Sequence, residues 1–358
     1  MVNEDKRNYG IDLLRIVAMF FIIMLHCYGQ GGVLYTVTVD SSQYKLAWFI
    51  EIFAYCAVDI FALISGYVCY REENQKIKFS RYINLWLQVV FYGIVLGLIF
   101  NAFDSKLFFP VANNLYWYFT AYTGLFFLMP IINNAIKNSN NELLKKTFIM
   151  IFIFFSIFSI FFNVFVLEKG YSFIWILLLY IMGAIIKKCD IGRNMKEWKA
   201  AVGILILVIV TYLYKMYGYT NDTITKDILV SYISPTILLS AVLYVIWFSK
   251  MKFNNIMKKI IKFAAGSAFS IYIINNHQVV WDNLMNRLFV EIANKELIGI
   301  IIHPLIFSVL FVIAAILIDK VRIFIFKILR IDKVSKFIED KLDWLLDSLI
   351  RDKTKNGF

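Results

Sequence analysis

Charged side chains are scarce in this sequence. Only 17% of its 358 residues are Asp, Glu, Lys or Arg, whereas 60% are hydrophobic. A soluble domain carries roughly a quarter charged residues, and a water-facing shell could not cover so large an apolar excess. The composition therefore excludes an ordinary soluble protein and predicts an integral membrane protein.

Cysteine is also sparse, and its four positions show neither metal-ligand nor disulfide spacing. We expect these side chains to be small buried fillers, and we expect no metal cofactor. A cleavable leader is missing as well. The apolar run 11–28 has no small-x-small site at its end, so we expect it to stay as the first membrane span.

Apolar runs of about 20 residues, the length that crosses a bilayer, recur along the whole chain. They predict an all-α, polytopic membrane helix bundle without internal repeats or a further soluble domain. We expect about ten transmembrane helices, near residues 11–28, 46–70, 83–103, 115–136, 147–167, 171–188, 200–217, 230–249, 264–286 and 297–318.

The basic residues fit this count. The even-numbered loops between spans hold three to five Lys or Arg residues each, and the odd-numbered loops about one. Because Lys and Arg accumulate in cytoplasmic loops, both termini are predicted to be cytoplasmic. The net charge of +12 is thereby explained without nucleic acid as a partner.

The C-terminal segment differs from the spans. Apolar residues such as Phe337, Leu342 and Leu349 recur at helical spacing opposite charged positions. This pattern favours an amphipathic helix on the cytoplasmic membrane surface, and equally a short soluble helix packed on the bundle. We divide the chain into a membrane domain, 1–325, and a cytoplasmic amphipathic tail, 326–358.

The first span contains two ionisable residues, Arg15 and His26. Their spacing places them roughly 20° apart around a helix and about 16 Å apart along it. Arg15 would lie near the cytoplasmic end and His26 in the outer half. Ionisable groups within spans are costly and usually functional. A snorkelling arginine and an interfacial histidine are the structural alternatives.

The second span adds two carboxylates. Glu51 is predicted at the depth of His26, and Asp59 nearer the midplane. A carboxylate at that depth could orient the imidazole for acid–base chemistry. The alternative is an inert buried pair or a neutral carboxyl.

Polar and aromatic residues are also expected in the outer half of later spans. Tyr116, Trp117 and Tyr118 open the fourth span, as an aromatic belt or as a platform on which a sugar stacks. In the ninth span three consecutive hydrogen-bonding side chains predict a polar cavity shared with His26. They are Asn275, Asn276 and His277.

Five motifs, in this order, resemble the acyltransferase type 3 family of bacterial membrane proteins. They are Arg15-x10-His26, AVDIFALISGY (57–67), LYWYF (115–119), YIMGAIIKK (180–188) and SAFSIYII (267–274). The resemblance extends from residue 8 to about 320. It implies transfer of an acyl group, commonly acetyl, from cytoplasmic acyl-CoA to a hydroxyl of a surface or lipid-linked glycan. It also implies that His26 and Arg15 are the essential residues of the first span.

We therefore predict a multi-pass O-acyltransferase of the cell membrane that uses acetyl-CoA or another acyl-CoA. Cations at the inner face would hold the CoA phosphates. Our candidates are Arg15, Arg81, Lys76 and Lys78. His26, oriented by a carboxylate, would act as general base or carry the acyl group. The alternatives are a glycan or small-molecule transporter or flippase, and a non-catalytic sensor of cell-wall precursors.

Overall fold

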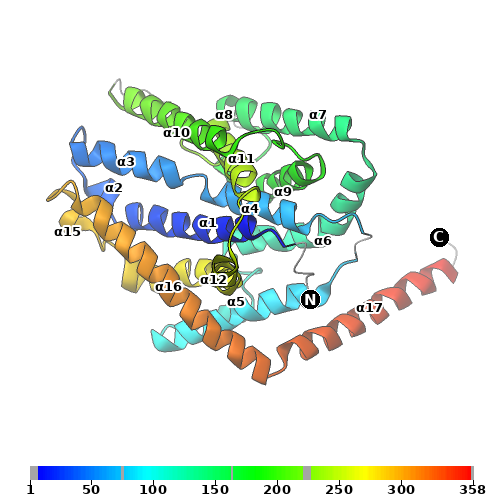
Figure 1. Ribbon diagram of the computed structural model, residues 1–358. Coiled ribbons are helices and arrows are strands. Elements are labelled where there is room, and N and C mark those ends of the chain that lie inside the picture. Colours follow the sequence, from blue (N-terminus) through cyan, green and yellow to red (C-terminus); the bar gives the residue numbers. More distant parts are fainter. Residues whose placement is uncertain (1–6, 74–75, 163, 221–226, 356–358) are drawn as a thin grey trace.

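The computed structural model describes residues 7–73, 76–162, 164–220 and 227–355. Its helices are assembled into one bundle, in which most of the long helices run in similar directions (Figure 1). Seven helical segments of the described chain are long and apolar enough to cross a membrane. They are Tyr9–Thr36, Ser42–Cys69, Phe79–Ile99, Trp117–Asn138, Asn141–Phe162, Glu197–Gly218 and Gly299–Ile328.

These seven segments coincide with seven of the ten predicted spans. Two of the other three predicted spans are shorter apolar helices, α9 (Phe173–Lys188) and α11 (Pro235–Ser249). The ninth differs from the prediction, because residues 264–286 do not form one continuous helix. There α13 (Ala268–Asn275) ends at Asn276, and α14 (Gln278–Val280) and a π-helical turn (Trp281–Met285) follow.

The first two spans are themselves composite. α1 (Tyr9–Tyr28) is followed by the single turn α2 (Val33–Thr36), and α3 (Ser42–Ala54) continues as α4 (Ala57–Cys69). The remaining elements that matter below are α5 (Phe79–Ile99), α6 (Trp117–Asn138), α7 (Asn141–Ile151), α10 (Glu197–Thr220), α12 (Asn255–Ala265), α16 (Gly299–Ile328) and α17 (Ile331–Lys355).

The centre of the bundle is the close packing of α4 on α9. A Cβ atom added at Gly66 would lie 1.9 Å from the Tyr180 carbonyl oxygen, and one at Gly183 would lie 2.0 Å from that of Leu63. The two helices therefore approach backbone to backbone, as small residues allow in membrane helices. Trp175 on α9 is fully buried in the same interface.

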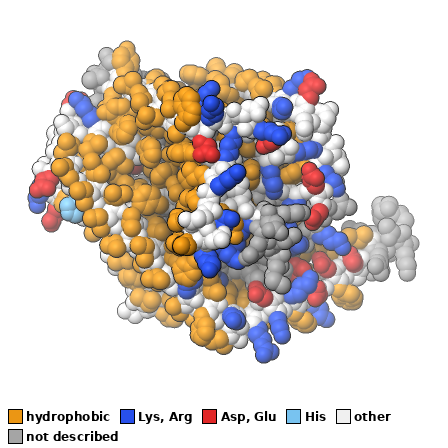
Figure 2. Space-filling view, in the orientation of Figure 1, with side chains coloured by type: hydrophobic (Ala, Val, Ile, Leu, Met, Phe, Trp, Pro, Cys, Tyr) orange, Lys and Arg blue, Asp and Glu red, His pale blue; other side chains and the backbone are white. Residues whose placement is uncertain are grey.

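The surface divides into an apolar and a charged region. Figure 2 shows hydrophobic side chains covering a broad band, and Lys, Arg, Asp and Glu side chains gathered mainly beyond one edge of it. An apolar exterior of this kind is stable in hydrocarbon and not in water. The molecule is an integral membrane protein.

The predicted C-terminal helix is present as α17, which packs against α5 through polar groups. The Ser335 hydroxyl donates to Asn84 at 2.7 Å, and the Ser80 N–H donates to Glu339 at 2.7 Å. Several apolar side chains of α17 are exposed, among them Phe337 at 63% and Leu345 at 47%. The domain boundary predicted after residue 325 lies in the last turn of α16.

Candidate active site

The side chain of His26 meets an amide from the broken ninth segment. His26 lies in the last turn of α1, and its Nδ1 is 2.5 Å from Oδ1 of Asn275, the last residue of α13. Asn275 is fully buried, and its Nδ2 donates to the sulfur of Met285 at 3.3 Å. The break after α13 therefore places this amide in a fixed orientation beside the imidazole.

This contact determines which His26 nitrogen carries the proton. The Asn275 oxygen can only accept a hydrogen bond, so Nδ1 must donate to it. In the neutral imidazole the lone pair is then on Nε2. The arrangement leaves Nε2 able to accept a proton or to attack an electrophile.

The His26 ring forms part of the wall of a cavity of about 160 Å³. The edge of the Trp281 indole packs on the imidazole, with ring centroids 4.9 Å apart. Most of the other lining residues are aromatic, and Tyr171 at the rim is 47% exposed. The cavity is lined by Met19, Ile22, Leu25, His26, Val58, Phe61, Trp117, Tyr118, Tyr171, Tyr232, Tyr272, Asn276 and Trp281.

The polar and aromatic residues predicted for substrate binding lie in three different locations. Trp117, Tyr118 and Asn276 line the cavity. Tyr116 and His277 lie outside that lining and pack on each other with ring centroids 6.3 Å apart. The His277 Nδ1 accepts the Val279 N–H at 3.3 Å and so caps α14. Asn275 contacts His26 itself.

The two predicted carboxylates are buried in the second composite span. Asp59 accepts a hydrogen bond from Trp175 Nε1 at 3.0 Å, which ties α4 to α9. Glu51 on α3 is 8% exposed, and its Oε2 has no hydrogen-bond partner in the described part of the chain. Within those residues, the hydrogen-bond partner of the His26 ring is the Asn275 amide and not a carboxylate.

The face of α1 that carries Arg15 and His26 is continuous. Met19 and Ile22, which lie between them at helical spacing, both line the cavity. Arg15 is 3.4 Å from Asp12, and its side chain is 25% exposed. Arg15 and Arg81 both lie near Cys69 and Tyr122, so the two arginines border one region.

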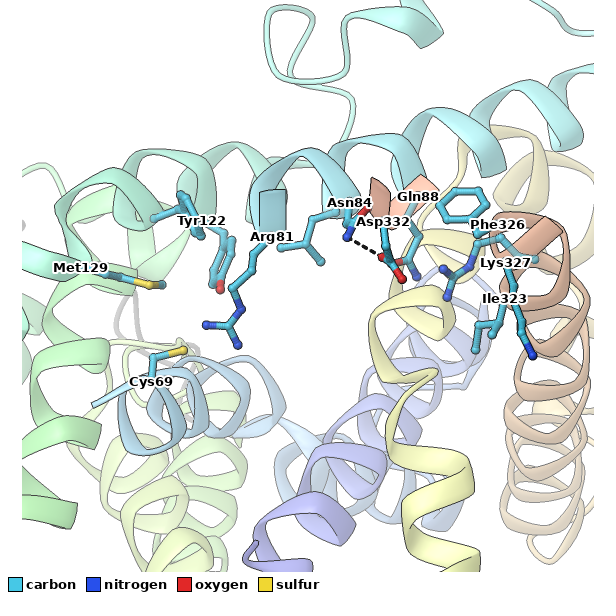
Figure 3. Close-up of a pocket in the computed structure, with 13 residues that line it drawn as sticks. Cys69, Arg81, Asn84, Gln88, Tyr122, Met129, Ile323, Phe326, Lys327 and Asp332 are labelled. Atoms are coloured by element: carbon cyan, nitrogen blue, oxygen red, sulfur yellow. Dashed lines mark hydrogen bonds between the residues drawn. The ribbon is translucent and has the colours of Figure 1, made fainter. Parts of the chain in front are cut away.

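That region is a second, larger cavity of about 750 Å³ between α5, α6, α16 and the start of α17. Figure 3 shows the Arg81 guanidinium reaching into it, with Cys69 and Tyr122 to one side. Its basic lining residues are Arg81, Arg322 and Lys327. The predicted residues Lys76 and Lys78 are exposed in the segment before α5 and are not part of this lining.

A buried polar network borders the second cavity and was not predicted from the sequence. Asp319, which has no exposed surface, accepts hydrogen bonds from Tyr92 at 2.8 Å and from Arg322 Nε at 2.8 Å. It also accepts one from Ser270, to which Gln88 donates. Gln88 was recognisable as a lone polar residue in an apolar run, whereas Asp319 lies at the end of such a run, directly before Lys320.

Comparison with known proteins identifies the family. A family model, described as an acyltransferase domain, matches residues 8–319 and so covers most of the chain. The chain belongs to the acyltransferase 3 family. It is a membrane acyltransferase, and the matched region extends from the first residue before α1 to Asp319 in α16. No curated protein and no solved structure matches it.

The matched region contains the whole lining of the small cavity and most of that of the large one, whose remaining lining residues lie between Arg322 and Asp332. Within the described residues, no group of three His, Cys, Asp or Glu side chains is arranged to hold a metal ion. The side chains available for chemistry beside the small cavity are thus an imidazole, an amide, phenols and indoles.

Proposed function

We propose that this acyltransferase moves an acyl group, acetyl in the simplest case, from cytoplasmic acyl-CoA to a hydroxyl of an extracytoplasmic or lipid-linked glycan. The observation that carries this proposal is the His26 imidazole, held by Asn275 at 2.5 Å, in the wall of an aromatic cavity. Such a group is suited to accept a hydroxyl proton.

We further propose that the membrane domain, 1–325, spans the cell membrane ten times with both termini in the cytoplasm. The two shorter helices and the broken ninth segment supply the three spans beyond the seven long ones. In this orientation the large cavity opens toward the cytoplasm, and the small cavity lies toward the outer surface.

The large cavity would receive the donor. CoA carries several phosphates, and guanidinium groups bind phosphate through paired, charge-assisted hydrogen bonds. Arg81, Arg322 and Lys327 line the cavity, Arg15 borders the same region, and the exposed Lys76 and Lys78 precede α5. In this proposal these cations hold the nucleotide while the acyl end extends into the bundle.

The two cavities are lined by neighbouring turns of α6. Tyr122 lines the large cavity and Tyr118 the small one, and residues four apart are about one helical turn, roughly 6 Å, apart. On α1, Arg15 lies one helical turn from Met19, which lines the small cavity. A pantetheine arm needs to pass only this short boundary for its thioester to reach His26.

In the direct route, Nε2 of His26 takes the proton of the acceptor hydroxyl as its oxygen attacks the thioester carbonyl. The carbon–sulfur bond breaks, and the imidazolium returns the proton to the CoA thiolate. In the alternative route, Nε2 attacks the thioester carbonyl, the carbon–sulfur bond breaks and the CoA thiolate leaves. The acceptor hydroxyl oxygen then attacks the acyl carbon, the nitrogen–acyl bond breaks, and the hydroxyl proton passes to the thiolate.

The aromatic walls suit a sugar. Trp117, Tyr118, Tyr171, Tyr232 and Trp281 line the cavity. Aromatic side chains of these types stack on the apolar side of a pyranose and hydrogen-bond its hydroxyls. Asn276 adds an amide at the same cavity. We assign positioning roles to Asp59, which ties α4 to α9, and to Tyr116 and His277, which pack behind the cavity.

Two measurements test this function. Purified protein in lipid nanodiscs should release free CoA from acetyl-CoA when an envelope glycan extract is added. Mass spectrometry of envelope glycans should show acetyl increments that are missing from cells without the chain. A transporter or sensor would release no CoA and would leave glycan masses unchanged, and that result would exclude the proposal.

A further inference from the structure

A basic hollow of about 1170 Å³ lies apart from both cavities, where the N-terminal end of α1 meets the start of α12. Its lining includes five basic side chains and no acidic one among the described residues. It is lined by Arg7, Asn8, Tyr9, Arg193, Ser249, Lys250, Met251, Lys252, Phe253 and Lys258.

Several of these cations are crowded together. Tyr9 is flanked by two of them, with the Arg7 guanidinium 5.6 Å and the Lys258 Nζ 5.7 Å from its ring centroid. Carboxylates partly offset Arg7, which is 2.5 Å from Asp12, and Arg193, which is 3.6 Å from Asp190. Among the described residues an excess of positive charge remains, and it favours an anion in the hollow.

Lys250 has a different role from the other basic residues. Its Nζ donates to the carbonyl oxygens of Gly192, Arg193 and Met195, at 2.5, 3.0 and 2.5 Å. These hydrogen bonds fix the loop that follows α9 against the end of α11. The hollow is therefore held in shape by Lys250, while Lys252 and Arg193 stay exposed at its edge.

α12 gives the hollow an apolar border. Ile261 and Ala265 are buried against the bundle, whereas Ile256, Ile260 and Phe263 are 71%, 54% and 52% exposed. The exposed three share one side of the helix by their spacing. Figure 1 shows α12 nearly end-on while α1, α3 and α5 run along the page, so α12 crosses the spans. Crossing helices with exposed apolar and basic residues are typical of a bilayer interface.

We propose that this hollow binds the phosphate of an anionic phospholipid headgroup in the leaflet that contains α12. Arg193, Lys252 and Lys258 would bind the phosphate. Ile256, Ile260 and Phe263 would lie among the adjoining acyl chains. A lipid, rather than a soluble phosphate, is favoured because one ligand then satisfies both the cations and the exposed apolar side chains. This inference does not depend on the proposed reaction.

The test is the affinity of the purified full-length protein for phosphatidylglycerol and phosphatidylcholine, measured by native mass spectrometry from detergent. Phosphatidylglycerol should bind more tightly than phosphatidylcholine. The double substitution Lys252→Gln with Arg193→Gln should weaken the binding of phosphatidylglycerol about fivefold for each charge removed. The matched control, Lys145→Gln with Lys146→Gln on α7, should change it less than twofold. Equal affinity for both lipids, or unchanged binding by the first pair of substitutions, would overturn the proposal.

Two further arms identify the source of the phosphate. The double substitution Ile260→Ser with Phe263→Ser should weaken the binding of both lipids, because the contacts with their acyl chains are lost. Inorganic phosphate and CoA should not displace the bound phosphatidylglycerol at millimolar concentration. Displacement by either, or full lipid affinity in the serine variant, would show a soluble-anion site instead.

Discussion

At the scale of single residues, the contact that organises the small cavity joins the His26 ring to the Asn275 amide. It fixes the tautomer and leaves Nε2 as the basic nitrogen. The arrangement follows the logic by which a third group orients a catalytic base, although here that group is neutral. The proposed chemistry therefore depends on a positioning residue as well as on His26.

Replacing that positioning residue gives the first prediction. Asn275→Ala removes the acceptor for Nδ1–H, so both tautomers and other ring orientations become accessible. We expect acyl transfer to fall about 100-fold, with the KM for acyl-CoA nearly unchanged. The control is Asn283→Ala, whose amide donates to its own helix at the Val279 carbonyl and should keep activity. Wild-type turnover in Asn275→Ala would disprove the orienting role.

The buried network at Asp319 gives the second prediction. Asp319→Asn leaves the Arg322 guanidinium, which is 2.7 Å away and 11% exposed, without its counter-charge. We expect the free energy of unfolding in detergent to decrease by about 3 kcal/mol. Asp340→Asn breaks an exposed pair with Lys336 and should cost less than about 1 kcal/mol. Similar losses of unfolding free energy in the two variants would show that the buried pair of Asp319 with Arg322 is no more important for stability than an exposed one.

Sequence reasoning proposed His26 as the reactive residue but did not identify its hydrogen-bond partner. Arg15 and His26 could be placed on one face because α1 is regular, and helical spacing alone decides that. The choice of Asn275 over Glu51 or Asp59 as the partner of His26 depended on where α13 ends. Tertiary packing sets that end, and no local pattern encodes it.

At the scale of elements, interruptions of helices matter more than their lengths. The turn at Asn276 and His277 separates α13 from α14, so Asn275 faces His26 while His277 becomes a helix cap. A search of the sequence for apolar runs of about 20 residues joins the two pieces into one predicted span. It also passes over α12, whose apolar residues at helical spacing were included in a basic loop. Recognising α12 from the sequence required the arrangement of its apolar residues along one side of a helix, rather than its mean hydropathy.

The docking of α17 on α5 gives a pH-dependent prediction. Partial burial alone would raise the pKa of Glu339, but hydrogen bonds from Lys336 and the Ser80 N–H outweigh it and lower this pKa to about 2. An unfolded glutamate titrates near about 4.3. The ionised group thus stabilises docking fully above about pH 5, and this contribution is lost as the pH falls toward 2.

Hydrogen exchange of α17 peptides, corrected for intrinsic rates, measures this effect. Exchange should rise between pH 5 and pH 3 in the unaltered chain. In Glu339→Gln, exchange should already be elevated at pH 6 and should change little with pH. An identical pH response in the two proteins would show that another group controls docking.

At the scale of the whole molecule, the division between apolar and charged surface was readable from composition and loop charge alone. The spatial order of the spans was not, because it depends on close contacts such as that of Gly66 with Tyr180. Seven long helices satisfied a length criterion, whereas α9 and α11 are shorter and are recognised by their place in the bundle. The orientation in the membrane remains our prediction.

Cysteine labelling on intact cells tests that orientation. In a chain whose four cysteines are replaced by serine, Asp104→Cys should react with an impermeant maleimide from outside. Glu142→Cys should react only after the cells are opened. Both side chains are well exposed, at 52% and 78%, so access depends on the side of the membrane. The opposite pattern would invert the topology and place the large cavity outside.

The central claim is that the His26 imidazole performs the acyl transfer, and its substitution tests this most directly. His26→Gln keeps a polar side chain of similar size but has no basic nitrogen, so acetyl transfer from acetyl-CoA to glycan in isolated membranes should fall at least about 100-fold. His303→Gln, which loses only a hydrogen bond to the Gly299 carbonyl of its own helix, should retain normal transfer. Normal product formation by folded His26→Gln would contradict the account.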